Sequence, residues 1–176
     1  MEPVKIGLNK WRLLFIILIS VIFIMNGLTM LIEVKDAVVR TNPFLVKLIG
    51  SASILFFGVI IYIASKQLFN PELGISLDED GMNDHSNGMA VGMINWANIT
   101  SIETNKFLWM KSLVIHTDNP EKYLGEASGL KLRVLAGNLN RTKTPIVIST
   151  RNLKMKHSEF KQLVEDFWSV SKSMKS

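Results

Sequence analysis

The sequence predicts an α+β membrane protein, in which a two-helix transmembrane hairpin precedes an antiparallel β-domain with a closing C-terminal helix. Three observations support this fold class. Residues 13–32 carry no charge, and residues 48–65 form a second apolar run. Short strand-like runs separated by turn residues follow them, which is typical of an antiparallel sheet. Near the C-terminus, apolar residues recur at helical spacing along one face.

The composition limits the chemistry of the chain. Its 176 residues include no cysteine, so disulfides and thiolate metal sites are excluded. The net charge is +5, and residues 119–176 hold eleven basic residues against five acidic ones. In a tethered domain such residues favour anionic lipid, although solvated lysines are the simpler interpretation. The candidate contacts with anionic lipid or a partner are Lys106, Lys111, Arg133, Arg141, Lys143, Arg151, Lys154 and Lys156.

The first helix is expected at residues 13–32, because twenty residues at about 1.5 Å each span the roughly 30 Å hydrocarbon core of a bilayer. Residues 1–12 are expected to be a cytoplasmic segment with basic Lys5, Lys10 and Arg12. A signal peptide is the alternative interpretation, but the apolar run is too long and no small-residue cleavage site follows it. We therefore expect an uncleaved transmembrane helix.

The second helix is expected at residues 48–65, after a short external loop at 33–47. The basic residues favour, by a small margin, a cytoplasmic location for both chain ends. Small residues let membrane helices approach closely, and a buried amide in hydrocarbon needs a partner. The sequence therefore predicts an interhelical contact that joins Asn26 with Gly50, Ser51 and Ser53. The alternative is that Asn26 faces a partner protein.

Residues 73–176 are expected to form one β-domain, curled into a barrel or a sandwich. The expected strands cover residues 74–77, a short run from 82, 90–95, 99–107, 113–116 and 145–149. A helix is expected from Asn119-Pro120 to about residue 136, with a loop at 138–144. Ser158 is expected to cap a last helix that runs to about residue 170. Its apolar face, which should be buried, consists of Phe160, Leu163, Val164 and Phe167.

The apolar run at residues 107–110 has two interpretations. It lies at the end of an expected strand, and a place in the core is the favoured one. The alternative is a hairpin tip that reaches into the membrane or a partner.

No catalytic, cofactor or metal site is expected from the remaining polar residues. His85, His116 and His157 have no metal-ligand spacing. Asp78, Asp80 and Asp84 lack the twelve-residue pattern of a calcium loop and fit a turn between strands. There is neither a nucleophile-elbow motif nor a phosphate-binding glycine loop. Nucleic acid is not expected as a partner, because no RNA-binding aromatic signature accompanies the basic residues.

The sequence resembles the pleckstrin-homology (PH) superfold. The resemblance rests on the expected antiparallel sheet with its C-terminal amphipathic helix, and on residues 77–102 with Asp80-Gly81-Met82 and Ile94-Asn95-Trp96-Ala97-Asn98-Ile99. With its helical hairpin, the chain resembles a group of small, uncharacterised bacterial membrane proteins, in which an Asn-Pro pair (Asn119-Pro120) starts a helix and a Thr-Pro pair (Thr144-Pro145) opens a strand. This resemblance implies a PH-like antiparallel barrel closed by the C-terminal helix, which serves as a scaffold for interactions. Eukaryotic PH domains bind phosphoinositides through a basic loop, but here its place is taken by acidic residues 78–80, so that activity is not expected.

Two functions are open on this evidence. The first is a membrane-anchored, non-catalytic interaction module, with a PH-like domain held at the cytoplasmic face of a bacterial inner membrane. There it would bind a protein partner, a second copy of the chain or anionic lipid. The alternative is an accessory subunit of a larger membrane enzyme or transporter.

Overall fold

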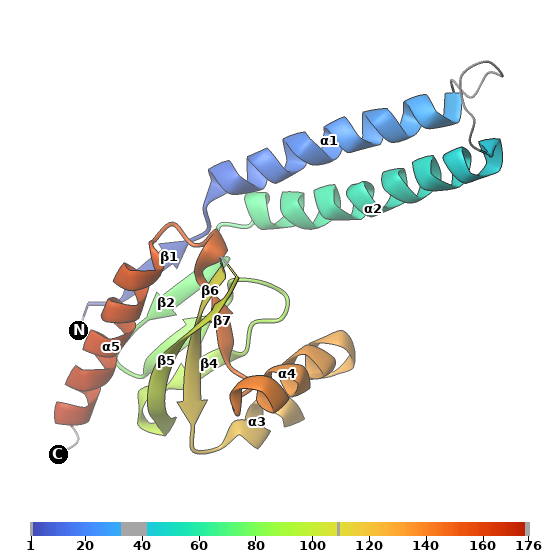
Figure 1. The fold of residues 1–176 in the computed structure, drawn as a ribbon. Helices are drawn as coiled ribbons and strands as arrows, with labels where there is room; N and C mark the ends of the chain where they lie inside the picture. Colours follow the sequence, from blue (N-terminus) through green and yellow to red (C-terminus); the bar gives the residue numbers. More distant parts are fainter. Residues whose placement is uncertain (1, 33–41, 109, 175–176) are drawn as a thin grey trace. The chain divides into compact units, whose positions relative to one another are not determined.

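The computed structural model describes residues 2–32, 42–108 and 110–174 (Figure 1). The chain divides into two compact units. A helical unit comprises residues 9–71, and a β-rich unit comprises residues 1–8 together with 72–176.

The helical unit consists of two antiparallel helices, α1 (Lys10–Ile32) and α2 (Pro43–Phe69). Both are long and apolar enough to cross a membrane. They extend beyond the expected ranges of 13–32 and 48–65, and α2 takes up the last part of the expected loop at 33–47. The reason is the cap: the Asn42 side chain accepts a hydrogen bond from the Phe44 N–H, and Pro43 follows it at the first helical position. Residues 33–41 lie outside the described part of the chain.

The two helices meet along a seam with coiled-coil spacing. The less exposed residues of α1 include Leu13, Ile17, Ser20, Ile24, Gly27 and Leu31, in alternating steps of four and three residues. On α2 the same spacing joins Val46, Gly50, Ser53, Phe57, Ile60 and Ala64. An average step of 3.5 residues is what keeps one stripe of a helix facing its neighbour over several turns.

The described residues of the β-rich unit form seven strands in two antiparallel sheets. The first sheet has the order β1 (Val4–Gly7), β2 (Gly74–Leu77), β3 (Gly81–Asp84) and β4 (Gly92–Asn95). The second has the order β5 (Ile99–Phe107), β6 (Met110–Thr117) and β7 (Val147–Ser149). Within the described residues neither sheet closes into a barrel, so the expected barrel is replaced by two separate sheets.

Strand β1 is the part of this fold that the sequence did not reveal. It precedes α1, yet it pairs with β2, which follows α2, in the register Val4↔Leu77 to Gly7↔Gly74. Ile6 is buried in the core beneath the sheet. The β-rich unit therefore includes residues 1–8 in addition to the expected domain at 73–176, and the expected N-terminal segment at 1–12 contains a strand.

The turn η1 (Trp96–Asn98) joins the two sheets. The Trp96 ring is buried, and its Nε1–H donates to the carbonyl oxygen of Asp78 at 2.8 Å. Its centroid lies 6.1 Å from that of Phe167 on the C-terminal helix. Trp96 thus connects the corner of the sheets to that helix.

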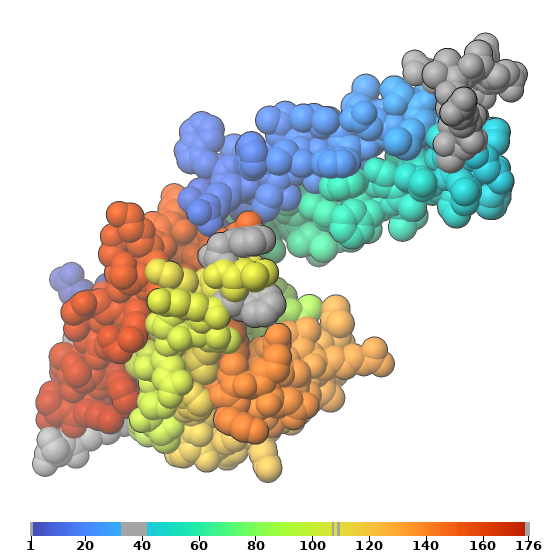
Figure 2. Space-filling model, viewed as in Figure 1, coloured from blue at the N-terminus to red at the C-terminus, as the bar shows by residue number. Residues whose placement is uncertain are grey.

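The C-terminal helix α5 (His157–Ser173) packs on the sheets, and Figure 2 shows it side by side with β5. Phe160, Val164 and Phe167 are buried as predicted, whereas Leu163 is half-buried. The N-cap is Lys156 rather than the expected Ser158. Its backbone N–H donates to the Glu159 carboxylate, which reaches back over the first turn.

The expected helix at 120–136 is divided into α3 (Pro120–Gly125) and α4 (Gly129–Thr142). The division falls at Gly129, whose φ of +58° is a conformation that favours glycine. The expected loop at 138–144 is wrong, because α4 continues to Thr142. Asn138 is buried there and its Nδ2 donates to the carbonyl of Pro145, which binds the last turn of α4 to the start of β7.

The role of β1 is testable by truncating its buried side chain. Ile6→Ala should lower the free energy of unfolding of the full-length protein by roughly 2–4 kcal/mol, because it removes buried methyl groups and leaves a cavity. The matched variant Lys5→Ala, on the exposed face of the same strand, should change it little. The measurement is urea unfolding in detergent, followed by near-UV circular dichroism. Equal effects of the two variants would contradict the pairing.

Candidate functional site

The β-rich unit has one end from which the chain leaves toward both helices. Gly7, at the end of β1, pairs with Gly74, at the start of β2. Leu8 forms an isolated bridge with Leu153, and the Lys154 N–H donates to the Gly7 carbonyl at 3.0 Å. We call this region, defined by Gly7, Leu8, Gly74 and Leu153, the exit end.

The β5–β6 hairpin reaches the same end. Lys111, at the start of β6, lies opposite Lys106 at the end of β5. The carbonyl of Lys111 accepts a hydrogen bond from the Thr150 hydroxyl at 3.3 Å. Thr150 begins the short turn η2 (Thr150–Asn152), which leads directly to Leu153. Contacts within the unit thus place the hairpin turn beside the exit end.

Four of the eight predicted basic contacts gather there. They are Lys106, Lys111, Arg151 and Lys154, and we call them the exit-end cations. All four are exposed. Arg151 lies next to the hairpin, with its Nη1 3.7 Å from the sulfur of Met110. The predicted group is therefore divided by the fold, and only this half forms a cluster.

Lys106 and Lys111 are directly opposite each other on neighbouring strands. Like charges in this position destabilise a sheet. Among the ion pairs between described residues, none joins either lysine to a carboxylate. The nearest acidic side chain along β5, Glu103, projects from the other face of the strand and lies 3.8 Å from His116. The arrangement is unfavourable for the sheet alone and suits an anionic ligand.

The turn between these lysines carries an exposed apolar residue. Leu108 has a φ of 53°, which is uncommon for a residue other than glycine, and 71% of its surface is exposed. The favoured core placement of the apolar run is therefore wrong at Leu108, while Trp109 lies outside the described residues. The hairpin ends in a protruding leucine between two lysines.

A histidine and two threonines hold the exit end together. The Thr150 hydroxyl donates to the Lys111 carbonyl, so it accepts from His157 Nδ1–H at 3.1 Å. His157 Nε2, at 3.0 Å, then accepts from the Thr104 hydroxyl. This neutral tautomer connects β5, η2 and α5. Burial lowers the pKa of His157, and the nearby charges of Lys111, Lys161 and Lys106 lower it further.

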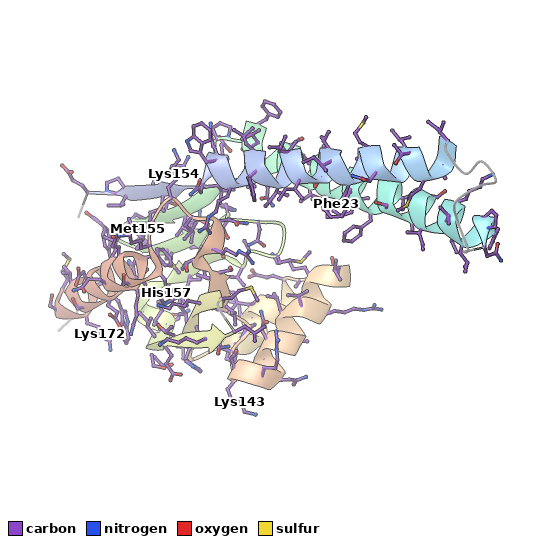
Figure 3. The ribbon with its side chains drawn as sticks, turned by 45° about the horizontal axis from the view of Figure 1, so that its top comes forward. Phe23, Lys143, Lys154, Met155, His157 and Lys172 are labelled. Carbon is purple, nitrogen blue, oxygen red and sulfur yellow. The ribbon has the colours of Figure 1, made fainter. Side chains whose placement is uncertain are left out.

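The other predicted basic residues lie elsewhere. Arg141 and Lys143 line a groove of about 380 Å³ beside the end of β6, together with Glu103 and His116. Figure 3 shows Lys143 and Lys154 at opposite ends of the β-rich unit. The groove thus contains side chains of both charges, and Arg141 also bonds the Asn138 side chain at 3.1 Å. Arg133 stands apart on the exposed face of α4, and exposed Lys156 lies 3.9 Å from Glu159.

The polar side chains of the β-rich unit mostly support its backbone. Asp78 accepts hydrogen bonds from the N–H groups of Asp80 and Gly81, as expected for a turn. Buried Asp84 accepts from the Ser86 N–H, and burial raises the pKa of this carboxyl group. Among the described residues, no three His, Asp or Glu side chains gather as metal ligands.

The contact between the helices differs from the predicted one. The Asn26 amide donates to the carbonyl of Ile22 in its own helix at 2.8 Å, and Ser51 is exposed. Gly50 and Ser53 do lie at the seam. The Ser53 hydroxyl donates to the carbonyl of Phe23 on α1, at 3.4 Å.

The close approach is made by Gly27 and Gly50. A Cβ atom at Gly27 would lie 2.9 Å from the Gly50 oxygen, and one at Gly50 would lie 2.8 Å from the Gly27 oxygen. Gly27 is not among the contact residues predicted from the sequence. The sequence did contain a signal for it: Leu13, Ser20 and Gly27 recur at seven-residue steps, and Ser20 and Gly27 are small.

Comparison of the chain with protein-family models, curated proteins and solved structures finds no match.

A pair of glycine substitutions tests the seam. Gly27→Ala should lower the stability of the protein in detergent by about 1–3 kcal/mol, because the new methyl group collides with backbone. Gly58→Ala is the matched control, since nothing lies within 4 Å of its added Cβ atom. It should be neutral or stabilising by up to about 1 kcal/mol through helix propensity. Thermal unfolding of both variants provides the measurement, and a neutral Gly27→Ala would contradict the close approach.

The His157 network predicts a pH dependence. The pKa of His157 is lower in the folded state than its ordinary value of 6.5, so the unfolded chain takes up the proton first. Stability should therefore be complete above pH 6.5 and should decline as the pH falls below it. Unfolding of the wild type and of His157→Gln, compared between pH 7.5 and 5.5, should show a steeper decline in the wild type. The shifted pKa of Asp84 affects the wild type and the variant equally. If the stability of the two proteins therefore changed with pH to the same extent, the assignment to His157 would be contradicted.

Proposed function

We propose that this chain is a two-pass membrane protein that holds a PH-like, non-catalytic interaction module at the membrane surface. The observation that carries the proposal is the pairing of β1 with β2. One strand precedes α1 and the other follows α2, yet they lie in one sheet. If the helices cross a membrane, both must cross it, because the two ends of the hairpin return to the same folded unit.

The surface of the helical pair supports insertion in a membrane. Large apolar side chains are exposed along both helices, including Phe15, Ile22, Leu55, Phe56 and Ile63. Monomeric proteins in water rarely expose such continuous apolar surface. At about 1.5 Å per residue the helices reach roughly 35 and 40 Å, enough for a bilayer core with some tilt.

The PH-like assignment is supported by two antiparallel sheets with a C-terminal helix packed on them. The interaction role is supported by the exit end, where cations gather around an exposed turn. The basic residues Lys5, Lys10 and Arg12, which lie before α1 or in its first turn, favour the cytoplasmic face of a bacterial inner membrane as the location, together with the family resemblance.

Single cysteines test the topology cleanly, because the native chain has none. Glu2→Cys and Glu126→Cys should both resist a membrane-impermeant maleimide on intact cells and react after permeabilisation. Asp36→Cys, in the connection between the helices, should react on intact cells. Labelling of Glu2→Cys and Glu126→Cys from opposite sides would contradict the two-pass proposal, and complete reversal of the pattern would contradict the cytoplasmic location alone.

A second candidate function is an accessory subunit of a larger membrane assembly. The observation that favours it is Asn26, whose amide is exposed on the outer surface of α1 although it lies well within the apolar helix. Polar side chains in this position join membrane helices by hydrogen bonds.

This candidate predicts an integral-membrane partner that co-purifies in mild detergent at a fixed ratio. Asn26→Leu should reduce the recovered partner several-fold, because a membrane hydrogen bond contributes about 0.6 kcal/mol on average. Met25→Leu, at the neighbouring exposed position, is the matched control. Absence of a stoichiometric partner would leave the interaction module as the function.

A further inference from the structure

We propose that the exit end of the β-rich unit docks on an anionic lipid surface through Lys106, Lys111 and Lys154, with Arg151 beside them and Leu108 at the point of contact. This inference rests on the proposed function, because it requires both helices to cross the bilayer. It goes beyond that function by naming the ligand and by selecting one end of the unit.

The connections of the chain keep the exit end near the lipid. Only residues 8–9 separate β1 from α1, and only residues 70–73 separate α2 from β2. Fully extended, these segments reach roughly 7 and 14 Å. The Debye length at physiological salt is about 8 Å. The shorter connection limits how far Gly7 can lie from the start of α1, and it is no longer than this length, so the exit end stays within reach of the surface potential of a membrane.

The charges at this end fit such a surface. Lys106 and Lys111 form an exposed like-charge pair across the hairpin, and the Lys154 backbone is bonded to β1 at Gly7. By contrast, Arg141 and Lys143 line a groove at the other end of β6 together with the acidic Glu103. Anionic headgroups would neutralise the lysine pair and remove its cost to the sheet.

The shape of the site favours lipid over a protein partner. Leu108 is 71% exposed at the hairpin turn, whereas the residues that dominate contacts between proteins are concentrated in well-packed pockets. A leucine flanked by lysines matches the boundary between acyl chains and headgroups, where apolar groups enter and cations remain at the phosphates. The Thr104–His157–Thr150 network holds this end of the hairpin in place.

The test uses the full-length protein in lipid nanodiscs, with an environment-sensitive dye on Leu108→Cys. In discs containing 30% phosphatidylglycerol, lipids that carry a quencher below the headgroup should quench the dye. In pure phosphatidylcholine discs, or at 1 M salt, quenching should be much weaker. Lys106→Gln/Lys111→Gln should lower the ratio of docked to undocked protein by about fivefold per lysine, which is roughly 25-fold for the pair.

Arg141→Gln/Lys143→Gln is the matched control, because it removes the same charge from the other end of the unit. Equal quenching in neutral and anionic discs, or an equal effect of the two double variants, would overturn the inference. The inference would also be overturned if the lipid quencher had no effect on the dye and the dye responded only to an added acidic protein. If Glu2→Cys and Glu126→Cys are labelled from the same side of the membrane and docking still fails, only this inference is overturned. If they are labelled from opposite sides, the proposed function is overturned as well.

Discussion

The antiparallel pairing of β1 with β2 is the constraint on which the rest of the structure depends. It joins two segments that are separated in sequence by the whole helical hairpin. The sheet supplies the ladder of hydrogen bonds, and Ile6 together with Leu8 supplies buried apolar surface. Because the sheet contains both ends of the hairpin, the helices are an insertion within the β-rich unit rather than an anchor attached to its start.

The same pairing determines which end of the unit is joined to the helices by the chain. It places Gly7 and Gly74 together, and the Leu8–Leu153 bridge then brings the connector before α5 to that end. Thr150 and His157 join this connector to the β5–β6 hairpin. The basic residues are in this way distributed asymmetrically, with a lysine pair at one end of the unit and a groove of mixed charge at the other.

The two helices are held together by a different interaction from the one that stabilises the sheets. Where surrounding lipid is as apolar as the side chains, close backbone approach rather than burial of apolar surface favours association. Gly27 and Gly50 provide that approach. Polar side chains of α1 form hydrogen bonds within their own helix: Ser20 donates to the Ile16 carbonyl, and Asn26 donates to that of Ile22. The depth of a polar residue in an apolar helix is therefore not enough to predict which residue it bonds.

The sequence by itself determined the elements whose signals are local. Two charge-free runs predicted the long helices, alternation and turn residues predicted β2 to β6, and the spacing of Phe160, Val164 and Phe167 predicted the buried face of α5. Gly125 and Gly129 marked the weak point at which the expected helix divides. These features depend on backbone preferences and periodicity within a few turns of chain.

Only the tertiary structure decided the features that depend on distant pairing. A four-residue strand such as β1 is too short for a periodic signal, and its partner lies beyond two long helices. The close approach at Gly27 depends on the register of α1 against α2, and a glycine has no side chain to indicate a face. The clustering of Lys106, Lys111 and Lys154, and their separation from Arg141 and Lys143, arises because strand pairing decides which chain ends meet. Composition can count such charges, but only the register of the strands assigns them to one end of the molecule.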